Sequence, residues 1–298
     1  MDEAEDRVNG EFSAFLRSRR ARLAPRDAGL PAGLGPRRVP GLRREEVARL
    51  AGVSVDYYVR LERGRAAHVS DAVLDALARA LRLDGTERAH LCTLAVPARR
   101  RSAGVPPGAT EPPPVGSAQR VRPGLLRLLD TLGDTPALVL GRRYDVLASN
   151  RAARALYTDF EALPVRERNM VRFLFLDEAA RTLYADWPAA ARSTVAGLRL
   201  YAGRHPRDPG LAELAGELCD RDADFRRWWG EHDVHERCHG VKRYRHPLVG
   251  ELVLGYEALA PTADADQVLG THTAEPGSPS EGALRRLAAL AAAPPPLS

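Results

Sequence analysis

One short run of the chain has the residue types and the spacing of a zinc peptidase motif. His235, Glu236 and His239 form the pattern H-E-x-x-H, with His232 three residues upstream. On a helix, two such histidines face one side and bind zinc, while the glutamate works as general base. Gly240 follows His239 and leads into a strand-forming segment, so we expect an exposed strand edge instead. No catalytic residue, metal ligand or cofactor is expected. Two alternatives stay open: a zinc hydrolase, and a structural metal site formed by His232, His235, Cys238 and His239.

A second stretch, 43–64, has the types and spacing needed to read DNA. Arg60 would lie on the exposed side of a short helix whose apolar side carries Tyr58, and an arginine there can bind guanine through two hydrogen bonds. Gly52 can end a preceding helix, and Ser54 can cap the next one by accepting a backbone N–H bond. Two short helices joined in this way favour a helix-turn-helix, although an ordinary helical hairpin has the same outline.

The segments around this motif are predicted to be helical. Apolar periodicity indicates helices over 12–23, on both sides of Gly52, over 71–83 and over 86–96, which makes a five-helix bundle. The segment 25–41 is rich in Gly, Pro and Arg and is expected to be a loop, with Arg37 and Arg38 near a DNA strand or simply solvated.

Charge and composition indicate two domains. The chain has 298 residues; 20 Arg and 14 acidic residues fall in 1–101, whereas 24 basic and 25 acidic residues fall in 102–298. A basic half joined to a neutral half suits a nucleic-acid binder fused to a second module. Between them, 97–117 is rich in Pro and Gly and is predicted to be an extended linker.

The sequence also predicts the compartment. No apolar run approaches the roughly 20 residues of a membrane span, and the acidic start does not have the pattern of a signal peptide. Three scattered cysteines form no disulfide framework. We therefore expect a cytoplasmic protein without membrane contact.

The second half mixes strands and helices. Strands are predicted over 137–140, 144–148, 241–244, 250–259 and 268–273, and helices over 150–157, 186–203, 211–219, 224–230 and 284–290. This order of elements predicts an α+β domain with an antiparallel sheet.

Two resemblances follow from these motifs. The segment EVARLAGVS followed by LERG resembles Xre/Cro-type helix-turn-helix proteins. The runs TPALVLGRRYDVLASN, NMVRFLFLDEAAR, LRLYAGRHPRDP, DFRRWWGEHDV, RHPLVGELVLGYEAL and HTAEPGSPSEGAL resemble the MmyB-like transcription regulators. The resemblance implies a DNA-binding domain at 8–96, the linker 97–117, a PAS-like ligand-binding domain at 118–292 and a disordered tail at 293–298. It further implies a dimer that binds double-stranded DNA and an apolar, fatty-acid-like molecule.

The helix-turn-helix resemblance assigns roles at the DNA. Base contacts are expected from Val55, Asp56, Tyr57 and Arg60, with Ser54 at the start of the same helix, and backbone contacts from Arg43, Arg44 and Arg65. Asp56 could instead cap the helix, and Tyr57 could lie on the sugar–phosphate backbone. The family loop Arg-Asn-Pro-Ser is replaced by 66–70, which affects backbone contacts.

The second resemblance places ligand contacts in the other half. Expected ligand-binding residues are Asn150, Phe160, Leu198, Arg199, His205 and Trp228. The aromatic and aliphatic members would form an apolar wall, while Asn150, Arg199 or His205 would bind an acid head. Asn150 could instead cap the following helix, and Arg199 could pair with an acid at the surface. Ser149 stands where the family usually has Trp, which alters the pocket's shape.

Overall fold

The helices and strands divide between two units. The computed structural model describes residues 3–30, 41–65, 69–95, 119–236, 238–262, 264 and 266–292, with side chains from residue 10 onward. The first unit combines Met1–Glu111 with Arg199–Asp208 and Trp228–Glu236, and the second combines Pro112–Leu198 with Pro209–Arg227 and Arg237–Ser298. The interpretations of Arg37 and Arg38, of 66–68, of the linker 97–117 and of the tail 293–298 lie outside the described residues.

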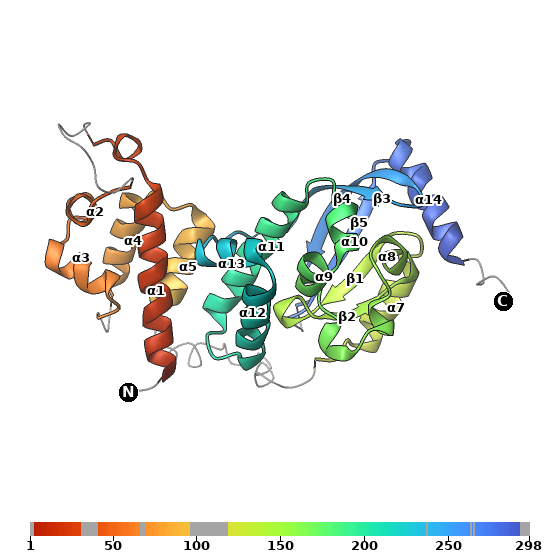
Figure 1. Ribbon diagram of the computed structural model, residues 1–298, viewed down its shortest axis with the longest axis horizontal. Coiled ribbons are helices and arrows are strands. Elements are labelled where there is room, and N and C mark those ends of the chain that lie inside the picture. The colour runs from red at the N-terminus through yellow and green to blue at the C-terminus, as the bar shows by residue number, and fades with distance from the viewer. Residues whose placement is uncertain are drawn as a thin grey trace. The chain divides into compact units, whose positions relative to one another are not determined.

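The first unit begins with the predicted helical bundle (Figure 1). Its helices are α1 (Glu3–Arg22), α2 (Arg44–Ala51), α3 (Val55–Glu62), α4 (Asp71–Ala80) and α5 (Gly85–Ala95), with a 3-10 turn at Pro25–Ala28. Helix α1 begins well before Phe12, where the prediction placed it. Residues 3–11 are mostly polar and carry no apolar stripe, so periodicity could not reveal this part of the helix.

Large apolar side chains from each of these helices meet in one core. Phe15, Val47, Tyr58, Leu77 and Leu91 are each at most 1% exposed. Leu200 and Val234, from the later segments of the first unit, belong to the same core. Burial of this apolar surface holds the short helices together, since helices of eight residues are marginal in isolation.

The second unit contains an antiparallel sheet, as predicted. Its strands are β1 (Ala137–Leu140), β2 (Val146–Ser149), β3 (His239–His246), β4 (Gly250–Leu259) and β5 (Val268–Ala274), in the order β2-β1-β5-β4-β3. The predicted hairpin pairs are present, and β5 joins them by pairing with both β1 and β4. This five-strand antiparallel sheet with helices confirms the α+β class expected for the domain.

The other described elements of this unit are helical. They are α7 (Pro123–Thr131), α8 (Arg151–Leu156), α9 (Met170–Leu176), α10 (Glu178–Leu183), α11 (Trp187–Arg204), α12 (Pro209–Arg221), α13 (Ala223–Gly230) and α14 (Pro279–Ala292), with 3-10 turns at Arg142–Tyr144, Phe160–Ala162 and Val165–Glu167. The last residues of α11 and α13 belong to the first unit. Among the described residues, no helix has the length and apolar character required to cross a membrane.

The register of the strands assigns each side chain to one face of the sheet. Ser149 pairs with Leu138, and Leu138 pairs with Gly270. His272, two residues beyond Gly270, pairs with Tyr256. Because paired residues project to the same side and alternate residues share a side, all five lie on one face, here called the His272 face.

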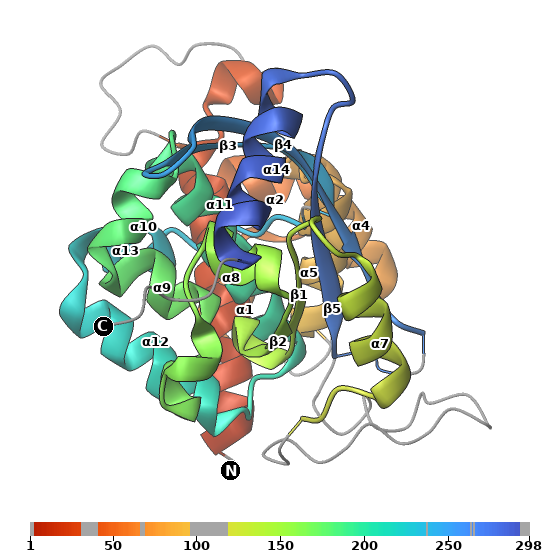
Figure 2. The same cartoon turned by 90° about the vertical axis from the view of Figure 1, so that its right-hand side faces the viewer.

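Helix α7 covers the opposite face. Its Leu125 and Leu129 pack with Ala137, Val139 and Leu269, which alternate with the residues of the His272 face. Figure 2 shows α7 beside β1 and β5. The two faces therefore carry different side chains and different neighbours.

Candidate nucleic-acid interface and ligand site

The turn between α2 and α3 has the predicted structure. Gly52 takes a φ of 67° after the last residue of α2, and the Val53 N–H donates to the Ala48 carbonyl at 3.0 Å. The Ser54 hydroxyl then accepts a hydrogen bond from the Tyr57 backbone N–H at 3.2 Å. Glycine is favoured where φ is positive, and serine is favoured at a helix N-cap, so local sequence fixes this turn.

The exposed face of α3 presents the residues predicted to read bases. Asp56 and Arg60 are exposed, Val55 is 46% exposed, and Tyr57 is half-buried. The Arg60 guanidinium lies 5.7 Å from the centre of the Tyr57 ring, within the range of a cation–π contact. Helix α3 thus offers a hydrogen-bond acceptor, a donor, an aromatic ring and an apolar side chain to the major groove of DNA.

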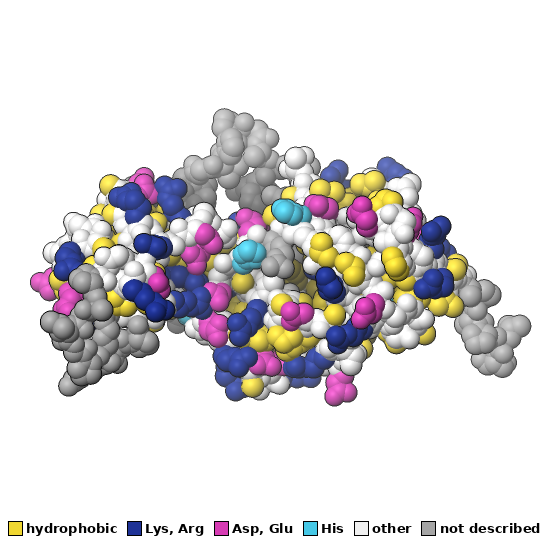
Figure 3. Space-filling view, turned by 90° about the horizontal axis from the view of Figure 1, so that it is seen from above, with side chains coloured by type: hydrophobic (Ala, Val, Ile, Leu, Met, Phe, Trp, Pro, Cys, Tyr) yellow, Lys and Arg dark blue, Asp and Glu magenta, His cyan; other side chains and the backbone are white. Residues whose placement is uncertain are grey.

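Three arginines predicted to contact the DNA backbone lie at the start of α2 and just after α3. Arg43, Arg44 and Arg65 are exposed as residues, and Arg43 starts α2 with its backbone N–H bonded to Glu46 at 2.7 Å. Figure 3 shows Lys and Arg side chains, interspersed with acidic ones, over one face of the first unit. Their charge suits phosphate contacts, which position a protein on DNA without reading its sequence.

Sequence reasoning missed a buried carboxylate, Glu62, at the end of α3. Glu62 is 2% exposed and accepts hydrogen bonds from Arg20 at 2.5 Å, from Arg44 at 2.7 Å and from the Tyr58 hydroxyl at 2.9 Å. Ser13 also donates its hydroxyl hydrogen to the Glu62 carbonyl. These bonds tie α1, α2 and α3 together. The Arg44 Nε–H bond holds that guanidinium group beside Glu62, although the Arg44 side chain is still 45% exposed.

The charge of Glu62 is stabilised by its partners. Burial alone would raise the pKa of the Glu62 carboxyl, but hydrogen bonds from Arg20 and Arg44 outweigh it and lower the pKa below its ordinary value. Burial, with the negative charge of Glu62 beside it, raises the pKa of Tyr58. Glu62 is therefore ionised and Tyr58 neutral, so the phenol donates and the carboxylate accepts.

In the second unit, Asn150 has a capping role. Its Oδ1 accepts from the Ala153 N–H at 2.9 Å and from the Ala137 N–H at 3.1 Å, and its Nδ2 donates to the Thr135 carbonyl at 2.8 Å. The capping alternative is thereby confirmed. The same amide also joins the start of β1 to the start of α8, which explains why it is 5% exposed.

An aromatic cluster lies at the His272 face. The Tyr157 ring stands 5.6 Å from His272, 6.0 Å from Tyr244 and 6.1 Å from Phe173. Phe160, one of the predicted wall residues, packs edge-on against Phe173 at 5.7 Å and is 1% exposed. Aromatic rings from 3-10 turn, helix and strand thus converge on one region of the second unit.

A chain of hydrogen bonds crosses this cluster. The hydroxyl groups of Tyr157 and Tyr244 are 2.8 Å apart, and the Tyr157 hydroxyl is 2.5 Å from His272 Nε2. Burial, with a contribution from positive Lys242, lowers the pKa of His272 well below its ordinary range. Burial likewise raises the pKa of Tyr157. The cluster is therefore a neutral polar centre in an aromatic environment.

Two polar atoms of the His272 face are buried without a partner. His272 Nδ1 and Ser149 Oγ accept or donate no hydrogen bond within the described part of the chain. His272 is 2% exposed and Ser149 is 6% exposed. A buried polar atom without a partner costs free energy, so such atoms in a protein interior need an explanation.

The other predicted ligand residues are buried in the core or contact other groups of the chain. Leu198 and Trp228 are buried. Arg199 is 3% exposed, donates to both Glu11 carboxylate oxygens at 2.9 and 2.8 Å, and lies 3.6 Å from the centre of a Trp229 ring. His205 stacks on Tyr201 at 4.4 Å. The pairing of Arg199 with an acid was foreseen, but it is buried instead of being at the surface.

The H-E-x-x-H run does not form a helix. His235 and Glu236 lie in an irregular segment, whereas His239 is the first residue of β3. Glu236 pairs with Arg204 at 3.3 Å. In the part of the chain that the structure describes, no group of three His, Cys, Asp or Glu residues is placed to hold a metal ion. The run therefore lacks the helical geometry on which a zinc peptidase depends.

The two units together have the architecture of a helix-turn-helix transcription regulator with a ligand-binding domain. A helix-turn-helix domain family matches residues 11–91, and the ligand-binding domain of the MmyB-like transcription regulators matches residues 121–287. No curated protein matches the chain. Since the second match spans more than half of the sequence, the chain belongs to the MmyB-like transcription regulators.

Proposed function

We propose that this regulator is a dimer whose operator affinity is controlled by an apolar, acid-headed molecule bound against the His272 face. The observation that carries the ligand part is the pair of buried, unpartnered atoms on that face, His272 Nδ1 and Ser149 Oγ. The aromatic side chains around His272 offer an apolar wall, and the two atoms offer hydrogen bonds. Ligand sites combine these two features: a largely apolar lining and a few polar groups that fix orientation.

The hydrogen-bond chain supports an acceptor at the ligand's polar end. When the Tyr157 hydroxyl donates to His272 Nε2, the imidazole proton resides on Nδ1 and can be donated to an acceptor of the ligand. A carboxyl oxygen is such an acceptor.

This proposal retains some predicted ligand residues and replaces others. Phe160 stays as part of the wall, whereas Leu198 and Trp228 are buried core residues and are not part of the proposed site. Asn150 and Arg199 already bind groups of the chain itself, so His272 and Ser149 take over the polar end. His205 remains a weaker alternative, since its ring stacks on Tyr201.

Ligand binding is tested on the full chain with a long-chain saturated fatty acid. The acid is expected to raise the melting temperature and to change the affinity for the operator, because a ligand shifts a conformational balance through its differential affinity. His272→Ala should remove both effects and leave ligand-free DNA binding intact. Thr271→Val, on the opposite face of β5, is the matched control. If the acid alters neither property of the wild type, this ligand class is wrong.

DNA reading is assigned to the exposed face of α3. We expect Arg60→Ala to relax specificity at one base pair of each half-site by about 1–3 kcal/mol, and Arg43→Ala to weaken binding to all sequences alike. Both are measured by titrating operator and single-substitution variants at physiological salt. Unchanged affinity in both variants would exclude α3 as the reading helix. Arg44 and Arg65 are further proposed backbone contacts.

A dimer is expected because one helix-turn-helix unit contacts few base pairs, and two related half-sites provide specificity. Light scattering of the full chain, alone and on an operator fragment, tests this expectation. A one-to-one complex on a site without symmetry would contradict it.

A further inference from the structure

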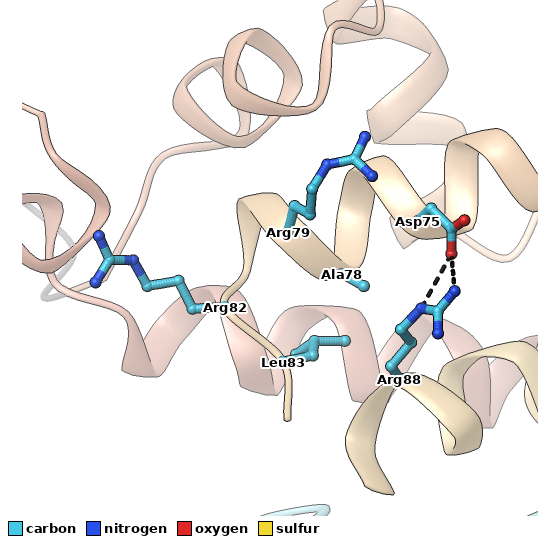
Figure 4. Close-up of a pocket in the computed structure, with 6 residues that line it drawn as sticks. All are labelled: Asp75, Ala78, Arg79, Arg82, Leu83 and Arg88. Carbon is cyan, nitrogen blue, oxygen red and sulfur yellow. Dashed lines mark hydrogen bonds and ion pairs between the residues drawn. The ribbon is translucent and has the colours of Figure 1, made fainter. Parts of the chain in front are cut away.

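A hollow between α4 and α5 carries arginines that the proposed DNA-reading face does not use. It encloses about 250 Å³, and its lining residues are Asp75, Ala78, Arg79, Arg82, Leu83 and Arg88 (Figure 4). Ala78 is buried and Leu83 is half-buried, whereas the three arginines are exposed. The hollow thus has an apolar base with cations at its rim.

Only part of this positive charge is balanced nearby. Arg88 donates to Asp75 Oδ1 through Nε at 3.0 Å and through Nη2 at 2.7 Å. Across the residues that the structure describes, neither the Arg79 nor the Arg82 side chain has a hydrogen-bond or ion-pair partner. Figure 4 shows these two guanidinium groups pointing away from one another, as like charges favour.

The backbone of Arg82 supplies an independent observation. Arg82 has a φ of 52°, in the left-handed region that favours glycine. The same kind of helix end occurs after α2 and after α3, where an N–H donates to the carbonyl five residues back: Val53 to Ala48, Arg65 to Arg60, and here Leu83 to Ala78. At the first two ends the left-handed residue is glycine, Gly52 and Gly64, each with φ of 67°.

This comparison shows that Arg82 occupies a position where the bundle elsewhere uses glycine. An arginine in the last turn of a helix also interacts favourably with the helix dipole, but Arg79 already lies in that turn. Strained residues that persist against local preference are commonly found at functional sites. Because glycine would fit this backbone conformation better, we expect the Arg82 side chain to have a function of its own.

We propose that this hollow binds a phosphate group through the exposed guanidinium groups of Arg79 and Arg82. Guanidinium groups bind phosphate through paired hydrogen bonds, and a doubly charged anion would offset the repulsion between the two cations. The phosphate could belong to a small phosphorylated molecule or to the backbone of bound DNA. The proposal does not depend on the ligand proposed for the second unit.

The first measurement uses Arg82→Gly in the full chain. Glycine removes the guanidinium and fits the backbone better, so the melting temperature without added anion should equal or exceed that of the wild type. A lower melting temperature would show that Arg82 serves the fold, and would overturn the proposal. Arg49→Ala removes another exposed arginine from the last turn of a helix and serves as the control.

The second measurement titrates sodium pyrophosphate at constant ionic strength. Wild type and Arg49→Ala should be stabilised, and Arg82→Gly should lose most of that response. The salt dependence of binding to a duplex of random sequence then identifies the source of the phosphate. A slope lowered by about one in Arg82→Gly indicates a DNA phosphate, whereas an unchanged slope with a lost pyrophosphate response indicates a free phosphorylated molecule. If the variant keeps both the wild-type response and the wild-type slope, no phosphate binds in the hollow.

Discussion

Each unit has a buried polar centre, one around Glu62 and one around His272, and the two are built differently. Glu62 is ionised and receives hydrogen bonds from two arginines and a tyrosine. His272 is neutral and receives or gives one hydrogen bond, to Tyr157, while its other ring nitrogen has no described partner. The first centre is complete within the chain, and the second is not.

This difference separates a structural role from a binding role. A fully satisfied ionic centre fixes the helices that it joins, because every rearrangement would leave a charge without a partner. A neutral centre with a free hydrogen-bonding atom can accept an additional group at little cost. The sequence resemblance drew attention to Asn150 and Arg199 as polar ligand contacts, but Asn150 caps a helix and Arg199 is paired with Glu11.

The largest expected effect is the loss of the Glu62 carboxylate. Glu62→Ala leaves Arg20, Arg44 and the Tyr58 hydroxyl without their shared partner, and should lower the free energy of unfolding by about 3–5 kcal/mol. Urea denaturation measures the change. The control is Glu45→Ala, whose exposed pair with Arg43 at 3.4 Å should contribute no more than about 1 kcal/mol. Similar losses in both variants would show that the Glu62 centre is not structural.

Removing one hydroxyl from the second centre should have a smaller effect. Tyr157→Phe leaves His272 Nε2 and the Tyr244 hydroxyl without this partner, and should cost about 1–3 kcal/mol of stability. It should also weaken the response to a long-chain acid, whereas Glu45→Ala should not. Tyr256→Phe keeps the ring beside His272 and serves as the control in thermal melts. An intact acid response in Tyr157→Phe would separate the hydrogen-bond chain from the ligand site.

Mild acid should distinguish the neutral centre from the ionic one. The pKa of His272 is lowered in the folded state, so below the ordinary value of 6.5 the unfolded chain binds a proton that the folded chain does not. The free energy of unfolding therefore decreases as the pH decreases below 6.5. One such group contributes up to about 1.4 kcal/mol per pH unit. The pKa of Glu62 is lowered too, but its contribution is lost only as pH falls below the ordinary carboxyl value of 4.5.

Hydrogen exchange between pH 7 and pH 5, corrected for the intrinsic rate, provides the measurement. Peptides from β5 should lose protection before peptides from α3. Burial lowers the pKa of His90 in the first unit to about 4, so the comparison is made in a His90→Gln background. His246 acts in the same direction as His272, since burial lowers its pKa as well. If peptides from α3 lost their protection at a higher pH than peptides from β5, the assignment of His272 as the acid-sensitive group would be wrong.

The smallest effect is expected at an exposed helix cap. Ser54→Ala removes the hydroxyl that accepts from Tyr57, and should lower stability by about 1 kcal/mol, whereas Ser54→Asp keeps an acceptor and should not. Thermal melts measure both variants. A loss as large as that of Glu62→Ala would mean that α3 depends on its cap as much as on its buried centre.

Local features of the fold were predictable from the sequence. The turn at Gly52 and Ser54, the cap at Asn150 and the hairpin between β3 and β4 each depend on residues that are near neighbours in the chain. The start of α1 was missed because its first residues carry no apolar stripe. The exposed face of α3 followed from the positions of Tyr58 and Leu61, which are fully buried.

Residue identity and spacing therefore determined the helix-turn-helix, its caps and the strand-forming segments, because backbone preference and apolar periodicity act over a few residues. The tertiary structure decided which distant groups became partners. Glu62 meets Arg20 across 42 positions, and His272 meets Tyr157 across 115. Such choices depend on how β5 inserts between β1 and β4 and on how helices pack, and these are set by burial of the whole core. Patterns over a few neighbouring residues do not predict such long-range partners.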